Sequence, residues 1–130
     1  MELLPGEEFD MPRVLISDKL ETLGLDLLRQ TGIDLDERHG LTGAALQEAL
    51  RAADGVIVRS GTRVTADLLD NPGKLRVIVR AGVGVDNIDV PAASQRGIVV
   101  ANVPGGNTIS AGEHAFALLL SLSRNIPQAD

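Results

Sequence analysis

The sequence contains no cysteine. This absence excludes disulfide bonds, thiolate ligands for a metal ion and a cysteine nucleophile. It is compatible with the reducing environment of the cytoplasm, where disulfide bonds are rare, and we expect the protein to reside there.

Aromatic residues are nearly absent, because Phe9 and Phe116 are the only two and neither tryptophan nor tyrosine occurs. Proteins that bind nucleic acid present basic residues to the phosphates, and those that bind single strands also stack the bases on aromatic side chains. Here 12 basic residues stand against 18 acidic ones, and the net charge is −6. We therefore expect no nucleic-acid partner.

Long hydrophobic runs are also missing, and no segment approaches the roughly 18 consecutive apolar residues of a membrane-spanning helix. The first ten residues contain Glu2, Glu7, Glu8 and Asp10 but no basic residue, so they do not resemble a signal peptide. We expect no membrane partner, and we predict that residues 1–10 form an acidic, flexible extension.

What the sequence does contain is enough apolar material for one folded domain, since 44% of its 130 residues are hydrophobic. Short β-branched runs are apolar at consecutive positions, which is typical of strands covered on both faces. These runs are Val14–Ile16, Val56–Val58, Val77–Val79 and Ile98–Val100, with Ile33–Leu35 as a weaker edge strand.

Segments between these runs carry apolar residues at helical spacing. They cover residues 20–28 and 45–53, a short stretch after Thr65, and Pro91 to Arg96. Alternating strands and helices predict an α/β fold, namely a flavodoxin-like parallel five-stranded sheet with helices on both faces.

The C-terminal segment breaks this alternation. Ser110 to Glu113 fits a capping box, and the long helix predicted after it is apolar around most of its circumference. We therefore predict a domain over residues 11–106 and a connecting helix over residues 107–130 that leads toward a further domain. An exposed face carrying Phe116, Leu119 and Leu122 also predicts a homo-oligomer.

A glycine loop follows the third of the strong strand runs, where Gly82 and Gly84 begin what looks like a dinucleotide fingerprint. Asn87 stands where the third glycine is expected, no good helix follows at once, and no acidic residue lies at the distance that ribose binding needs. The alternatives are a loop whose N–H groups bind an anion such as a carboxylate, or a tight turn that needs a positive φ.

Polar residues follow the strand runs at the edge where ligands bind in such sheets. Arg59 and Ser60 end one run, Arg80 ends the next, and Asn102 follows the last. Arginine suits bidentate contact with a carboxylate or phosphate. The alternative is that each arginine pairs with a nearby acid such as Asp86 or Asp89.

Two other site types fit the sequence poorly. His39 and His114 are the only histidines and lack the spaced partners of a metal site, so we expect no metal ion and assign no catalytic residue to this chain. A phosphoacceptor domain would need an aspartate at the position of Arg59 and Ser60.

Several segments resemble the D-isomer-specific 2-hydroxyacid dehydrogenases, over residues 12 to 130 almost without a gap. They are Arg13 to Asp18, Asp54 to Ser60, Leu75 to Asp89 and Gly97 to Asn102, and Ser110 to Glu113 resembles the family's connection between its two domains. The block Ala81-Gly-Val-Gly-Val-Asp-Asn87 is the most specific of these features. Arg59 and Ser60 resemble the members that oxidise 3-phospho-D-glycerate in serine biosynthesis.

This resemblance implies roles for particular residues. Arg59, Ser60, Arg80 and Asn102 would hold a small anionic, phosphorylated substrate, and the backbone of Val83, Gly84 and Val85 would bind its carboxylate. It also implies NAD as the cofactor of the full-length protein, bound mainly by a nucleotide domain that carries the catalytic residues. The chain alone is then expected to be catalytically inactive.

Two alternatives remain open from the sequence. One keeps the family but changes the substrate to another 2-oxo or 2-hydroxy acid, such as glyoxylate or hydroxypyruvate. The other is a stand-alone, non-catalytic flavodoxin-like binding module.

Overall fold

A computed structural model of the chain describes residues 11–124. The predicted extension over residues 1–10 and the last six residues of the predicted connecting helix lie outside this range. None of the helices that the structure describes is both long and apolar enough to cross a membrane.

All strands of the single sheet run parallel, in the spatial order β2-β1-β3-β4-β5. This order confirms the predicted five-stranded flavodoxin-like arrangement. The strands are β1 (Arg13–Ile16), β2 (Asp34–Glu37), β3 (Gly55–Val58), β4 (Val77–Arg80) and β5 (Val99–Asn102). Each β-branched run found in the sequence supplies or overlaps one of the other four strands. The edge strand β2 is mostly acidic, and it begins one residue and ends two residues later than predicted.

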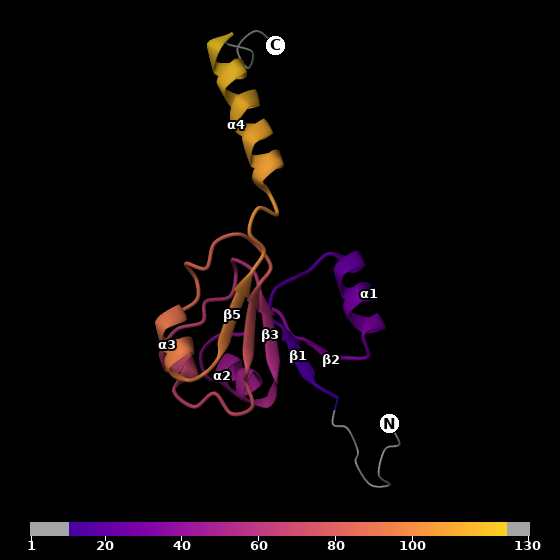
Figure 1. Cartoon of the computed structure of the whole chain (residues 1–130), viewed down its shortest axis with the longest axis vertical. Helices are drawn as coiled ribbons and strands as arrows, with labels where there is room; N and C mark the ends of the chain where they lie inside the picture. The colour runs from indigo at the N-terminus through magenta and orange to yellow at the C-terminus, as the bar shows by residue number, and fades with distance from the viewer. Residues whose placement is uncertain (1–10, 125–130) are drawn as a thin grey trace.

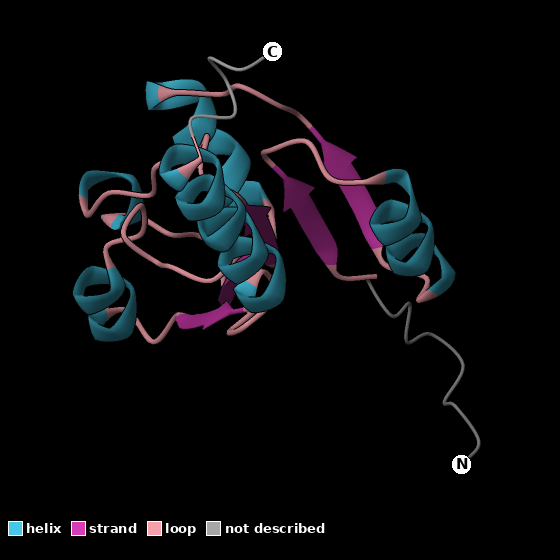
Figure 2. Cartoon of the chain, turned by 90° about the horizontal axis from the view of Figure 1, so that it is seen from above, coloured by secondary structure: helices cyan, strands magenta, loops and turns pink. Residues whose placement is uncertain are grey.

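Helices lie on both faces of the sheet, as predicted (Figures 1 and 2). Alternate residues of a strand point to opposite faces, so Val56 and Ile78 face one side and Ile57 and Val79 the other. The first side is covered by α2 (Gly43–Ala52), the short 3-10 helix η1 (Asp67–Leu69) and α3 (Val90–Gln95). On the second side lies α1 (Thr22–Gln30), next to the edge strand β2.

The hydrophobic core lies between the sheet and the α2–α3 layer. Leu15, Val56, Val58 and Ile78 from the strands are almost completely buried there, together with Leu50 from α2. The helices of this layer bury one face of the strands, and close packing in the core therefore fixes where each strand ends. The loops that follow the strands therefore start from rigid ends.

The other face of the sheet is only partly covered. Val79 and Ile57 are half-buried, and Val99 on the edge strand is 62% exposed. An open apolar groove of about 540 Å³ runs between this face and α1, lined among others by Leu27 and Leu28. On the α1 side, the strands thus become more exposed from β1 toward β5.

The C-terminal helix α4 (Thr108–Ser123) leaves the body and extends away from it (Figure 1). None of its residues is buried. The predicted capping box is wrong: Ser110 lies inside the helix, and Asn107 occupies the N-cap position. The helix starts earlier because the chain already turns at Gly105, whose carbonyl accepts a bond from the Thr108 N–H, and because Ala111 N–H bonds to Asn107.

Candidate functional site

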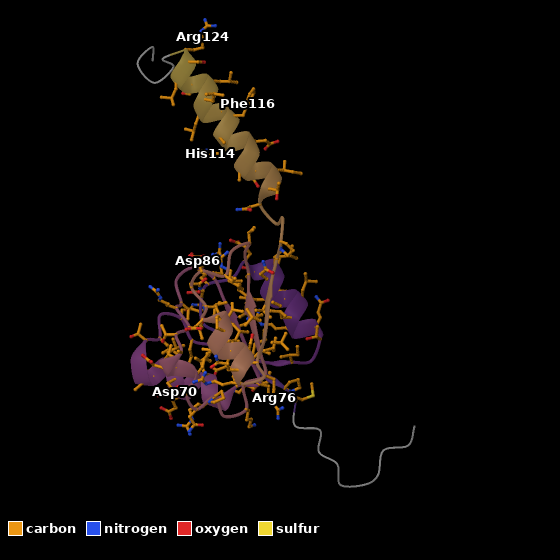
Figure 3. All side chains as sticks on the ribbon, turned by 60° about the vertical axis from the view of Figure 1, so that its left-hand side comes forward. Asp70, Arg76, Asp86, His114, Phe116 and Arg124 are labelled. Carbon is orange, nitrogen blue, oxygen red and sulfur yellow. The ribbon has the colours of Figure 1, made fainter. Side chains whose placement is uncertain are left out.

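The carboxyl ends of three neighbouring strands meet in one register. Val58 at the end of β3 pairs with Arg80 at the end of β4, and Arg80 pairs with Asn102 at the end of β5. The loops that follow these strands therefore begin side by side. In Figure 3, Asp86 of the glycine loop lies at the end of the body from which α4 leaves, and Asp70 and Arg76 lie at the opposite end.

An open pocket of about 490 Å³ lies at this edge. It is lined by residues from the loop after β3, the glycine loop after β4 and the segment that leads to α4. These are Arg59, Ser60, Arg80, Ala81, Gly82, Val83, Gly84, Val103, Gly106 and Asn107. Five of the seven residues named from the sequence, all but Val85 and Asn102, thus line a single pocket.

Arg80 places a guanidinium group against the glycine loop. Its Nη1 lies in the space that a β-carbon on Gly82 would occupy. Its Nε is buried and has no hydrogen-bond partner. A buried guanidinium nitrogen without an acceptor is costly, and it favours an anion nearby.

Arg59 is exposed at the opposite side of the pocket and donates from Nη1 to the carbonyl oxygen of Lys19 at 3.2 Å. Within residues 11–124, neither Arg59 nor Arg80 forms a salt bridge, and Asp89 instead accepts a hydrogen bond from the Ala92 N–H at the start of α3. Arg59 and Arg80 therefore do not pair with Asp86 or Asp89, which was the alternative left open by the sequence. Two cationic groups remain available to a ligand.

The glycine loop offers free N–H groups beside these cations. In the part of the chain that the structure describes, the N–H groups of Val83, Gly84 and Val85 bond to no other group. Neither Gly82 nor Gly84 has a positive φ, so the interpretation as a turn that needs such a φ does not hold. Gly82 is required for space, because the Arg80 side chain lies over it.

The two other residues predicted from the sequence lie behind the pocket. Asn102 donates from Nδ2 to the carbonyl oxygen of Val83 at 2.6 Å, so it supports the glycine loop from β5. Val85 is half-buried after Gly84, and its carbonyl accepts a bond from Ile88 N–H at 3.0 Å. Their positions fit supporting roles better than direct contact with a ligand in the pocket.

Two residues that sequence reasoning did not assign to the site also reach it. Asp18, after β1, accepts bonds from the N–H groups of Arg59 and Thr62. Asn87 donates to the carbonyl oxygens of the same two residues. Two sequence signals included Asn87 without giving it a role: it stands where a dinucleotide fingerprint would have its third glycine, and it ends the block that most resembles the family.

The described residues do not form a dinucleotide site. The glycine loop is followed by a chain segment that pairs at Ile88 with Val64, and α3 begins only at Val90 with six residues. Dinucleotide binding needs a helix N-terminus directly after the glycine turn to face the pyrophosphate. No step involving NAD is therefore assigned to this loop.

The histidines lie away from the pocket. His114 is exposed on α4, well clear of the body (Figure 3). His39 is exposed after β2, at the far edge of the sheet. Neither lines the pocket.

The sequence of the chain is similar to those of known proteins. Residues 14–125 match the model of the D-isomer specific 2-hydroxyacid dehydrogenase catalytic domain. D-3-phosphoglycerate dehydrogenase from Synechocystis sp. is 45% identical over 128 residues, which cover 98% of this chain and 23% of that relative. The enzyme of the same name from Archaeoglobus fulgidus is 45% identical over 118 residues, covering 91% of this chain and 22% of that relative.

Solved structures agree with the fold. The NAD⁺-bound 3-phosphoglycerate dehydrogenase of Entamoeba histolytica superposes with a TM-score of 0.74 at 27% identity, covering 85% of this chain and 39% of that one. The chain thus spans less than a quarter of the length of the two curated relatives above. Because the family model covers most of the chain, we conclude that this protein belongs to the D-isomer specific 2-hydroxyacid dehydrogenase family.

Proposed function

We propose that this chain is the substrate-binding part of an NAD-dependent dehydrogenase and that it binds 3-phospho-D-glycerate. One observation carries the proposal. Arg59 and Arg80, neither of them engaged in a salt bridge within residues 11–124, share one pocket with the free N–H groups of the glycine loop. The ligand that fits is a small molecule with two anionic ends.

The division of charge supports a phosphorylated substrate over a plain 2-hydroxy acid. A carboxylate is matched by the free N–H groups of Val83 and Gly84, in the manner of a backbone anion site. The guanidinium groups of Arg59 and Arg80 then remain for a second anion, and planar guanidinium groups suit phosphate. Glyoxylate and hydroxypyruvate carry no second anion, so they would leave these cations unmatched.

NAD belongs to this proposal as the cofactor of the longer protein. The Synechocystis and Archaeoglobus relatives are more than four times as long as the segment that each shares with this chain. The described residues lack a dinucleotide site. We therefore assign the cofactor site and the catalytic groups to the part of the longer protein that lies outside the segment shared with this chain. The proposed reaction of the longer protein is the oxidation of 3-phospho-D-glycerate in serine biosynthesis, and we propose that it takes place in the cytoplasm.

The chain divides near residue 106 in this proposal. Residues 11–106 form the binding domain, and residues 107–130 connect it to the cofactor domain. The position of α4, which begins at Thr108 with no buried residue, supports this division.

Titration of the isotope-labelled chain by NMR tests the proposed ligand. We expect 3-phospho-D-glycerate to shift the amide signals of Arg59, Val83 and Gly84, and D-glycerate to do so only at much higher concentration. We expect NAD to leave these signals in place. Equal affinities for the two glycerates would favour the alternative with an unphosphorylated substrate, and shifts with NAD alone would contradict the assignment of the glycine loop.

A further inference from the structure

The Arg59–Thr62 segment, which carries one side of the pocket, is held by two side chains that come from two other loops. Asp18 accepts through Oδ2 from the N–H of Arg59 at 2.6 Å and from the N–H of Thr62 at 3.0 Å. Asn87 donates through Nδ2 to the carbonyl oxygens of Arg59 and Thr62, both at 2.6 Å. The same two residues are thus bound at both their donors and their acceptors.

We propose that Asp18 and Asn87 are positioning residues that join the Arg59–Thr62 segment to the glycine loop, so that the two sides of the anion pocket keep a fixed separation. This inference rests on the proposed function of that pocket. Asp18 follows β1, the Arg59–Thr62 segment follows β3, and Asn87 follows β4. Since these strands are neighbours in the sheet, the middle loop is held from both sides.

The chemistry of each side chain matches the groups that it holds. An ionised aspartate only accepts hydrogen bonds, and it faces two N–H groups. The asparagine amide nitrogen carries two protons, and it faces two carbonyl oxygens. An aspartate at position 87 would place a carboxylate oxygen against two carbonyl oxygens, so this position requires a donor.

The surrounding backbone reinforces this arrangement. A β-carbon on Gly61 would lie 2.6 Å from Asp18 Oδ1, so the segment passes too close to Asp18 for any other residue without a shift. On the other side, Val64 N–H donates to the Asn87 carbonyl at 2.9 Å, and Asp89 N–H donates to the Val64 carbonyl at 2.9 Å. Main chain and side chain of Asn87 therefore bind the same neighbouring segment.

Asn87 acts through its nitrogen alone. Its Oδ1 is buried without a hydrogen-bond partner, and the side chain as a whole is half-buried. If Asn87 mattered only by filling space, an aspartate of the same shape would replace it well. If it mattered as a donor, aspartate would be worse than alanine, because a carboxylate oxygen would face both carbonyl oxygens.

Amide hydrogen exchange of the full 130-residue chain, followed by NMR, tests the donor role. The variants are Asn87→Ala and Asn87→Asp, with Asn71→Ala and Asn71→Asp as matched controls, because Asn71 is exposed and lies in the loop after η1. We expect exchange at Arg59 and Thr62, relative to that at Ile78 in the core, to rise at least about tenfold in Asn87→Ala and further in Asn87→Asp. Both Asn71 variants should stay within about twofold of the unchanged chain.

Affinity for 3-phospho-D-glycerate provides the second readout. We expect Asn87→Ala to weaken binding by about tenfold relative to Asn71→Ala, since a loosened segment no longer presents Arg59 at a fixed place. Exchange that is unchanged in Asn87→Ala, or slower in Asn87→Asp than in Asn87→Ala, overturns the donor role. Equal affinity of Asn87→Ala and Asn71→Ala overturns the positioning role.

The two proposals fail in different ways. If the unchanged chain binds no 3-phospho-D-glycerate, the proposed function fails and the positioning role fails with it, whatever the exchange rates show. If the unchanged chain binds and the Asn87 variants bind equally well with raised exchange, only the positioning role fails.

Discussion

The guanidinium group of Arg80 lies over Gly82, in the space that a β-carbon at that position would fill. Arg80 is the last residue of β4, and Gly82 lies two residues later in the loop that lines the pocket, so the side chain folds back over its own loop. The Gly82 N–H also donates to the Arg80 carbonyl at 2.8 Å. This short-range relationship places a cation at the floor of the proposed anion site.

Replacing Gly82 by alanine should therefore move Arg80 without unfolding the domain, because the clashing atoms are the far end of a flexible side chain. We expect affinity for 3-phospho-D-glycerate to fall by about tenfold, and the free energy of unfolding to change by less than about 1 kcal/mol. NMR titration and urea denaturation measure the two quantities. Gly24→Ala is the control, since nothing lies within 4 Å of the added carbon in α1 and the variant should bind normally. Normal binding by Gly82→Ala would show that Arg80 is not needed where it lies.

Arg80→Lys keeps the charge and removes the planar fork. We expect the affinity for 3-phospho-D-glycerate to fall by roughly tenfold or more, because an ammonium group cannot reproduce bidentate contact with an oxyanion. Arg76→Lys is a matched control, since Arg76 is exposed at the opposite end of the body (Figure 3). If both variants bind as the unchanged chain does, Arg80 contributes only charge.

Alanine substitutions at Gly73 and Gly97 distinguish two contributions to the free energy of unfolding, namely backbone strain at positive φ and a steric clash of the added β-carbon. Both have a positive φ, 59° and 70°. A β-carbon on Gly73 would clash with the backbone of Arg51, whereas at Gly97 nothing lies within 4 Å. We expect Gly97→Ala to cost about 1 kcal/mol of unfolding free energy and Gly73→Ala clearly more, up to about 3 kcal/mol. Urea denaturation compares the two, and equal losses would contradict the role assigned to the Arg51 contact.

The apolar residues of α4 should drive self-association of this chain. Phe116 is 62% exposed and Leu119 is 61% exposed on a helix without a buried residue. We expect light scattering to show a concentration-dependent mass for the unchanged chain, and a monomer for Leu119→Asp. Ser110→Asp changes the charge equally on the same helix and should associate like the unchanged chain. A monomer at all concentrations would contradict the predicted homo-oligomer.

Local sequence patterns were sufficient for the strands and for most of the residues that line the pocket. β-branched runs such as Val56–Val58 define buried strands by themselves, and parallel strands bring their carboxyl ends to one edge. The sequence therefore predicts that Arg59, Arg80 and the glycine loop meet if their strands are neighbours, and the structure places them in one pocket.

The bonds that hold the loops could not be predicted in the same way. Asp18 and the residues that it binds are separated by 41 and 44 positions, and nothing in a local pattern links them. Asn87 stood out as a missing glycine and as the end of the block that resembles the family, but neither signal indicates that its side chain bonds across 25 and 28 positions. The start of α4 was misplaced for a related reason, because a positive φ at Gly105 directs the chain into the helix before Ser110.

The helix α4 is joined to the body only through the segment that follows β5, and Val103, Gly106 and Asn107 of that segment also line the pocket. If the pocket binds the proposed anion, a rotation of α4 about this segment would have its pivot beside the ligand. The 16 residues of α4 make an arm of roughly 24 Å, so a rotation of about 10° at the pivot displaces the far end by about 4 Å. By this geometry, a small adjustment around an anion in the proposed site would produce a much larger displacement at the far end of the helix.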